Sequence, residues 1–161
     1  MSSSKPQDDA SRALAAAVRY ANRGVRSRRE VAAHLRRRGW SSRAVAQAAA
    51  RCAGGGFVDD RVGARLWAEQ WARQGYAWAA IRVKLAAKGF SARAIEEAAR
   101  GIAHPVDEAA RARQLIATRR RSARDPRQRF RLARLLLSRG FYPELIEQVL
   151  GASIEEDGAV D

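Results

Sequence analysis

Apolar residues recur along this chain at helical intervals and in the same order three times. The phrases LRRRGWSSRAV at residues 35–45, LAAKGFSARAI at residues 85–95 and LLSRGFYPELI at residues 136–146 align on a glycine, and successive glycines are 50 and 51 residues apart. In each copy, apolar residues lie eight and four positions before the glycine and one and six positions after it. They are Val31, Leu35, Trp40 and Val45, then Ile81, Leu85, Phe90 and Ile95, then Leu132, Leu136, Phe141 and Ile146. A fixed period of this length is typical of one supersecondary unit repeated in tandem.

Each repeat predicts three helices. The apolar pair four residues apart predicts a helix that ends at the glycine, because glycine readily adopts positive φ. Ser41 and Ser91 can cap the helix that follows, and Pro143 suits its first position in the third copy. A helical pattern also precedes each pair, over residues 10–22, 59–74 and 106–121, where Asp59 or Asp60 can cap the second of these. No segment alternates as a half-buried strand does.

The sequence therefore predicts an all-α protein, a tandem array of three three-helix repeats. The array is expected to be elongated, and either straight or curved. A repeat of about 50 residues buries little apolar surface alone, so neighbouring repeats are expected to dock on one another, or to rely on a partner, for full stability. The expected organisation is a disordered tail over 1–9, repeats over 10–53, 54–103 and 104–151, and an acidic disordered tail over 152–161.

The charge of the chain is strongly positive and unevenly distributed. Thirty-one Lys and Arg against 17 Asp and Glu give a formal net charge of +14. Residues 10–53 and 109–142 each hold eleven Arg and one acidic residue, whereas residues 54–108 hold eight basic and seven acidic residues. Two cationic ends indicate contact with a phosphate backbone or an acidic protein surface at more than one place. Arginine on solvated helix faces, with no partner, remains the alternative.

Candidate catalytic and metal-binding chemistry is sparse. His34 and His104 are the only histidines and Cys52 is the only cysteine, and none of them has a partner at metal-ligand spacing. The triple glycine at 54–56 lacks the Lys of a phosphate-binding loop and is interpreted as a turn. We expect no enzyme activity, no cofactor and no metal. With no signal peptide or long apolar run, we expect a soluble cytoplasmic protein without membrane contact.

Several phrases in these repeats are similar to those of a known family. The strongest are GFVDD at residues 56–60, GYAWAAI at 75–81 and KLAAKGF at 84–90, supported by SRREV at 27–31 and LSRGF at 137–141. Over residues 11–150 the chain resembles the RecX regulatory proteins, which modulate the RecA recombinase. It departs from the family pattern at Ala77 and Trp78, where Gly-Pro is usual, and at Lys84, where an acid is common.

The resemblance implies a negative regulator that lies in the groove of the RecA filament on single-stranded DNA. It would inhibit strand exchange, ATP hydrolysis and coprotease activity in recombination and SOS repair. Such a groove offers phosphates and acidic protein surface over a length that suits linked repeats with cationic ends. The candidate contacts are Arg36, Arg37, Arg43, Arg82, Lys84, Arg93, Arg119, Arg120, Arg127, Arg131 and Arg134.

Two other functions remain open at this point. A helical array can bind DNA without sequence preference and without any recombinase, using the same arginines. It can also be a protein-interaction scaffold in which arginine only confers solubility. We expect a monomer, because tandem repeats with solvated ends need no second copy.

Overall fold

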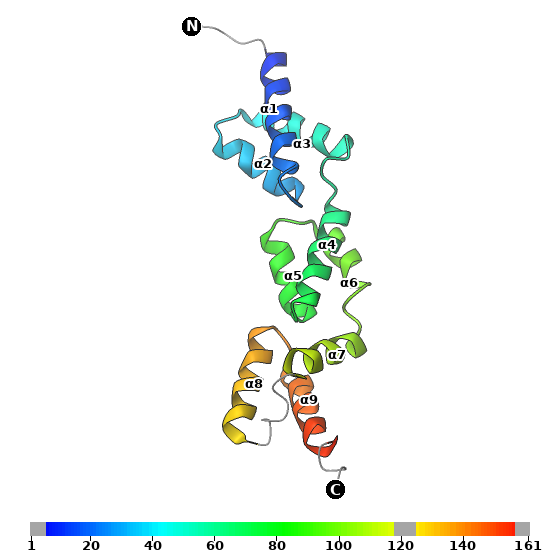
Figure 1. Cartoon of the computed structure of the whole chain (residues 1–161). Helices are drawn as coiled ribbons and strands as arrows, with labels where there is room; N and C mark the ends of the chain where they lie inside the picture. Colours follow the sequence, from blue (N-terminus) through cyan, green and yellow to red (C-terminus); the bar gives the residue numbers. More distant parts are fainter. Residues whose placement is uncertain (1–5, 118–124, 157–161) are drawn as a thin grey trace. The chain divides into compact units, whose positions relative to one another are not determined.

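The structure, a computed structural model, describes residues 6–117 and 125–156, which form nine α-helices and no strand within that part of the chain (Figure 1). In chain order they are α1 (Pro6–Ala21), α2 (Arg28–Arg37), α3 (Ser42–Gly54), α4 (Asp60–Arg73), α5 (Trp78–Ala87), α6 (Ala92–Ala99), α7 (Pro105–Ile116), α8 (Pro126–Ser138) and α9 (Pro143–Glu156). Three helices fall in each repeat. The prediction of an all-α protein built from helical repeats is confirmed.

The helix starts follow the predicted capping chemistry. Ser41, Ser91 and Asp59 each accept a backbone N–H of the next helical turn through a side-chain oxygen, at 3.2, 3.3 and 2.8 Å. Pro143 is the first residue of α9, where its missing N–H leaves no hydrogen bond unmade. These local signals explain why every repeat restarts a helix just after its glycine.

The ends of the helical region differ from the predicted boundaries. Helix α1 begins at Pro6, within the tail expected over residues 1–9, because proline is well suited to the first helical position. Helix α9 continues to Glu156, whereas a disordered tail was expected from residue 152. Its last residues, ASIEE, contain no residue that breaks a helix, so nothing stops α9 at the end of the repeat.

The chain divides into two compact units. The first unit comprises Met1–Trp67 and Leu85–Glu97. In it α1, α2 and α3 pack on one another around a core that includes Val31, Leu35 and Val45, all at most 1% exposed. Alanines on the buried face of α1 let that helix approach its neighbours closely.

Within the first unit, the start of α2 is bonded to residues of the next repeat. Ser27 and Glu30 form a reciprocal capping box, with hydrogen bonds of 2.9 and 3.0 Å. The Ser27 hydroxyl also donates to the carbonyl oxygen of Lys88 at 2.6 Å, and the N–H of Arg28 donates to Asp60 Oδ1 at 2.9 Å. We call the contacts of Ser27 and Arg28 with Lys88 and Asp60 the first joint.

The second unit comprises Ala68–Lys84 and Ala98–Asp161. Here α9 packs against both α7 and α8, and the core includes Ile116, Leu136 and Phe141, each at most 2% exposed.

Within the second unit, the start of α5 is bonded to the third repeat in a similar way. The N–H of Ala77 donates to the carbonyl oxygen of Arg139 at 2.9 Å, and the N–H of Trp78 donates to the Glu108 carboxylate. We call these contacts the second joint. Gly140, with φ of +87°, lies next to it and takes a conformation that other residues rarely adopt. The expectation that neighbouring repeats dock therefore has a specific hydrogen-bonded form in each unit.

The aligned apolar positions form the cores of the repeats. All of them except Trp40 are buried. Trp40 is half-buried, and the Arg12 guanidinium lies 5.9 Å from its ring centroid. The repeated pattern in the sequence is thus chiefly a packing pattern, which leaves the charged residues between these positions to form the surface.

Candidate basic interaction surface

The candidate arginines of the first repeat lie where α2 ends and α3 begins. Arg36 and Arg37 occupy the last turn of α2, and Arg43 is the second residue of α3. All three side chains are exposed. The cations in α2 also interact favourably with the negative end of the helix dipole, so their placement has a structural reason as well. We call Arg36, Arg37 and Arg43 the first arginine face.

The candidate arginines of the third repeat lie on one side of α8. Arg127, Arg131 and Arg134 are spaced by four and three residues and are exposed, so they share a helix face. Phe130 and Leu137, 65% and 52% exposed, fall at the same helical spacing. Asp125 caps this helix by accepting the N–H of Arg127. We call Arg127, Arg131 and Arg134 the second arginine face; it combines positive charge with apolar area, whereas the sequence analysis singled out only its charge.

The two remaining candidates of the third repeat, Arg119 and Arg120, lie outside the residues that the structure describes.

The candidates of the middle repeat differ in whether the charged group already has a partner. Arg82 is exposed on α5. Lys84 is half-buried, with its Nζ atom 4.6 Å from the ring centroid of Tyr76 and 5.5 Å from that of Trp71. A cation held over two aromatic rings already has a stabilising partner. The structure therefore gives Lys84 a packing role that the sequence analysis did not foresee.

Arg93, the third candidate of the middle repeat, is exposed and engaged in a charge network. Its guanidinium lies 3.2 Å from the Glu97 carboxylate, to which Arg61 also donates. The hydrogen bond from Arg61, followed by that from Arg93, holds the pKa of Glu97 below its ordinary value. Two arginines on one carboxylate leave a net positive charge at the surface, so Arg93 keeps an electrostatic role.

Two of the three cations that directly precede a repeat glycine, Lys88 and Arg139, lie over aromatic rings. Lys88 Nζ lies 4.2 Å from the Trp67 ring centroid and 3.5 Å from the Glu30 carboxylate. Arg139 lies 4.4 Å from the Tyr76 ring centroid. The ring contacts add to the favourable interaction of a cation in the last turn of a helix with the helix dipole.

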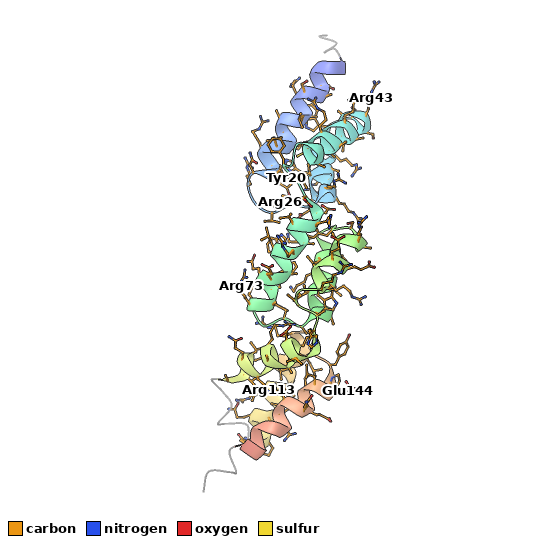
Figure 2. All side chains as sticks on the ribbon, turned by 90° about the vertical axis from the view of Figure 1, so that its right-hand side faces the viewer. Tyr20, Arg26, Arg43, Arg73, Arg113 and Glu144 are labelled. Carbon is orange, nitrogen blue, oxygen red and sulfur yellow. The ribbon has the colours of Figure 1, made fainter. Side chains whose placement is uncertain are left out.

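A stacked pair of rings near the first arginine face was missed by the sequence analysis. The rings of Tyr20 and His34 are parallel within 4° with centroids 3.9 Å apart, and the Arg26 guanidinium lies 4.7 Å from the Tyr20 centroid. Figure 2 labels Tyr20 and Arg26 in this part of the first unit. Burial lowers the pKa of His34, and the charges of Arg38 and Arg37 lower it further. The spacing from residue 20 to residue 34 crosses a loop, so no helical period could have indicated this pair.

The residues suggested for other chemistry have structural positions. His104 caps α7 by accepting the N–H of Val106 at its Nδ1 atom. Cys52 is buried, and burial raises the pKa of its thiol. Among the described residues, no group of His, Cys, Asp or Glu could hold a metal ion. Within the same ranges, no helix is long and apolar enough to span a bilayer.

Comparison with known proteins adds a relative and two similar structures. No protein-family model matches the chain. The regulatory protein RecX of Thermobifida fusca (strain YX) is 30% identical over 160 residues, covering 97% of this chain and 86% of that protein. The crystal structure of RecX from Lactobacillus salivarius superposes with a TM-score of 0.80 at 18% identity, covering 92% of this chain and 99% of that one. A second crystal structure of regulatory protein RecX gives 0.74 at 19% identity, covering 89% and 72%.

The helical repeats and the exposed arginine faces define a basic helical-repeat protein. The RecX protein of Thermobifida fusca indicates the family, because its sequence identity to this chain extends over nearly the whole of the chain. This chain belongs to the RecX family of regulatory proteins.

Proposed function

We propose that this protein is a negative regulator of the RecA recombinase. It binds the filament that RecA forms on single-stranded DNA and inhibits strand exchange, ATP hydrolysis and coprotease activity in recombination and SOS repair. Family membership supports the choice of partner. The observation that carries the mode of binding is the presence of two exposed arginine faces, each in a different compact unit.

The two faces suit a partner with repeated negative charge. Guanidinium groups bind phosphate and carboxylate oxygens through paired hydrogen bonds, and they remain charged at any physiological pH. Several weak contacts on one chain raise the effective concentration of each, so that the whole binds more tightly than any face alone. Phe130 and Leu137 add apolar area to the second face, which favours a contact that includes protein as well as DNA.

The test is the single-strand-dependent ATP hydrolysis of RecA, titrated with this protein below one copy per RecA. Inhibition at such ratios is the expected result, because a regulator seated on a filament affects many subunits. Binding to naked single-stranded DNA is measured beside it. No inhibition, together with tight binding to naked DNA, would overturn the proposal and favour a DNA-binding repeat protein that acts without a recombinase.

The salt dependence of filament binding distinguishes the proposed function from a third one, that of a protein-interaction scaffold. Contacts between arginine and phosphate release counterions, so affinity falls steeply with salt concentration. An affinity that is insensitive to salt would instead indicate a protein-interaction scaffold in which the arginine faces play no part.

A further inference from the structure

A small pocket lies between α1 and α2 in the first compact unit, beside the stacked rings. Its lining consists of residues from the end of α1, the loop that follows, and the end of α2. They are Ala16, Arg19, Tyr20, Arg23, His34 and Arg38. No carboxylate is among them. The cavity volume is about 120 Å³, well below the roughly 300–1,000 Å³ of pockets that hold whole organic ligands. The pocket therefore suits a small ion or a single functional group.

Three guanidinium groups share this pocket. Arg19 lies in the last turn of α1, Arg23 lies in the loop that follows, and Arg38 is the residue that ends α2. One cation at each helix end would be enough to complement the dipole. A third one, with no acidic side chain in the lining, leaves positive charge that an anion would neutralise. All three side chains are exposed and can adjust to a ligand.

The lining of the pocket includes a stacked pair of rings. The His34 ring stacks on Tyr20, and the Arg26 guanidinium lies 4.7 Å from the Tyr20 ring centroid. Arg26 lies 4.0 Å from the Glu30 carboxylate, so it is partly neutralised outside the pocket. An imidazole fixed by stacking offers a ring N–H at a defined place, which a tetrahedral oxyanion can accept.

We propose that this pocket binds one phosphate group, with Arg19, Arg23 and Arg38 as charged donors and His34 as a ring N–H donor. Planar guanidinium groups match the oxygen spacing of phosphate, and three of them can surround one group. The phosphate can come from the backbone of a single-stranded nucleic acid or from free inorganic phosphate. Occupation by a nucleic-acid backbone rests on the proposed function. Binding of free inorganic phosphate depends only on the residues of the pocket.

The first test uses the two histidines as separate reporters. Proton NMR follows the imidazole signals of the whole protein during a pH titration, in inorganic phosphate and in sodium chloride of equal ionic strength. Phosphate in the pocket should raise the pKa of His34, because an adjacent anion stabilises the imidazolium. His104, in the second unit, should keep its chemical shift at fixed pH. An equal pKa of His34 in phosphate and in chloride would refute phosphate binding in this pocket.

The second test uses a double variant and a single-site control. Arg23→Gln with Arg38→Gln removes two exposed donors without touching the core, and should weaken phosphate binding at least about tenfold. Arg51→Gln removes one exposed arginine from α3, which does not line the pocket, and should bind phosphate as the parent protein does. Unchanged binding by the double variant would overturn the proposal.

The source of the phosphate is decided by a short oligothymidylate. If a nucleic-acid backbone occupies the pocket, the double variant should bind the oligonucleotide with a shallower salt dependence, by about 0.7 in the logarithmic slope for one phosphate. Loss of inorganic phosphate binding with an unchanged slope would assign the pocket to free phosphate. Inhibition of RecA is measured on the parent protein. Inhibition by a parent protein that binds no inorganic phosphate refutes only the pocket, and phosphate binding by a parent protein that does not inhibit RecA refutes only the proposed function.

Discussion

The hydroxyl of Ser27 donates a 2.6 Å hydrogen bond to the carbonyl oxygen of Lys88, a residue 61 positions further along the chain. Ser27 is fully buried, and it also caps α2. At the same position of the second repeat, the backbone N–H of Ala77 donates to the carbonyl oxygen of Arg139. The acceptor is in both cases the residue before a repeat glycine. Each of the first two repeats is therefore bonded to the next one at the same position. The donor is a side-chain hydroxyl in the first case and a backbone N–H in the second.

Replacing Ser27 by alanine should destabilise the protein through this joint. The variant loses a helix cap, worth about 1 kcal/mol, and leaves the partly buried carbonyl of Lys88 without its donor, which costs about 1 kcal/mol more. Urea denaturation should show the sum. Ser41→Ala is the control, because Ser41 caps α3 with a bond of 3.2 Å inside its own repeat and should cost only the first amount. Equal losses for both variants would mean that the bond to Lys88 contributes nothing.

The repeat glycines should tolerate alanine unequally. Gly39 and Gly140 have similar positive φ, +81° and +87°, so alanine costs about 1–2 kcal/mol at either position. A Cβ at Gly39 would meet no atom within 4 Å, whereas at Gly140 it would lie 2.6 Å from the Ala80 Cβ atom. Gly140→Ala should therefore lose a further 1–3 kcal/mol or so through overpacking. Thermal denaturation of the two variants measures the difference, and similar melting temperatures would contradict the close packing at the second joint.

Neutralising the second arginine face should change the salt dependence of DNA binding. If Arg127, Arg131 and Arg134 each contact one phosphate, the triple change to glutamine should reduce the logarithmic slope by about 2 for single strands. Fluorescence anisotropy at several salt concentrations gives this slope, on naked DNA and on the RecA filament. Arg100→Gln, an exposed change in the nearly neutral middle repeat, should leave it unaltered. A triple variant with the parent slope would exclude this face from the phosphate contacts.

Lys84 should matter more for stability than for binding. Lys84→Met keeps most of the alkyl chain but removes the charge above Tyr76 and Trp71, which should cost about 0.5–2 kcal/mol in urea denaturation. Its binding to the filament should keep its salt dependence. Arg82→Met, an exposed change on the same helix, should leave the free energy of unfolding unchanged and reduce the salt dependence of filament binding. Unchanged stability of the Lys84 variant would show that the aromatic contacts carry no weight.

The stability of the protein should decrease as the pH falls through the range in which His34 titrates. Because the pKa of His34 is lowered in the folded protein, the unfolded chain binds more protons, and the free energy of unfolding rises with pH. The contribution is complete above the ordinary pKa of histidine and is lost as the pH falls through the lowered value. Urea denaturation from pH 8 to pH 5 should show a shallower dependence for His34→Gln. The carboxylates contribute equally to both proteins, so identical curves would contradict the lowered pKa.

The repeat pattern predicted the helices well because their signals are local. A glycine at a fixed distance from an apolar pair, followed by serine or proline, identifies the end of one helix and the start of the next. Ser41 and Pro143 show this directly. Helix α1 was placed too late, since its polar beginning lacks the apolar spacing that defines the rest of the pattern.

The candidate surface was predicted less completely, because its chemistry depends on contacts between distant residues. Exposure of Arg43 or Arg131 follows from helical spacing alone. The ring contacts of Lys84, by contrast, depend on how α4 and α5 pack, and the stack of Tyr20 on His34 depends on the loop between two helices. A charge count cannot distinguish a free arginine from a cation that an aromatic ring already holds.

The boundaries of the compact units have a consequence for how the chain comes apart. The unit boundary falls between Trp67 and Ala68 in α4 and between Lys84 and Leu85 in α5, so it runs through the middle repeat and not between repeats. A protease cut or a truncation at a sequence-repeat boundary would remove one side of a joint and leave its donors facing water. The repeats of the sequence and the compact units therefore have different boundaries, and a fragment cut at a repeat boundary should be less stable than one with a single end inside the second repeat.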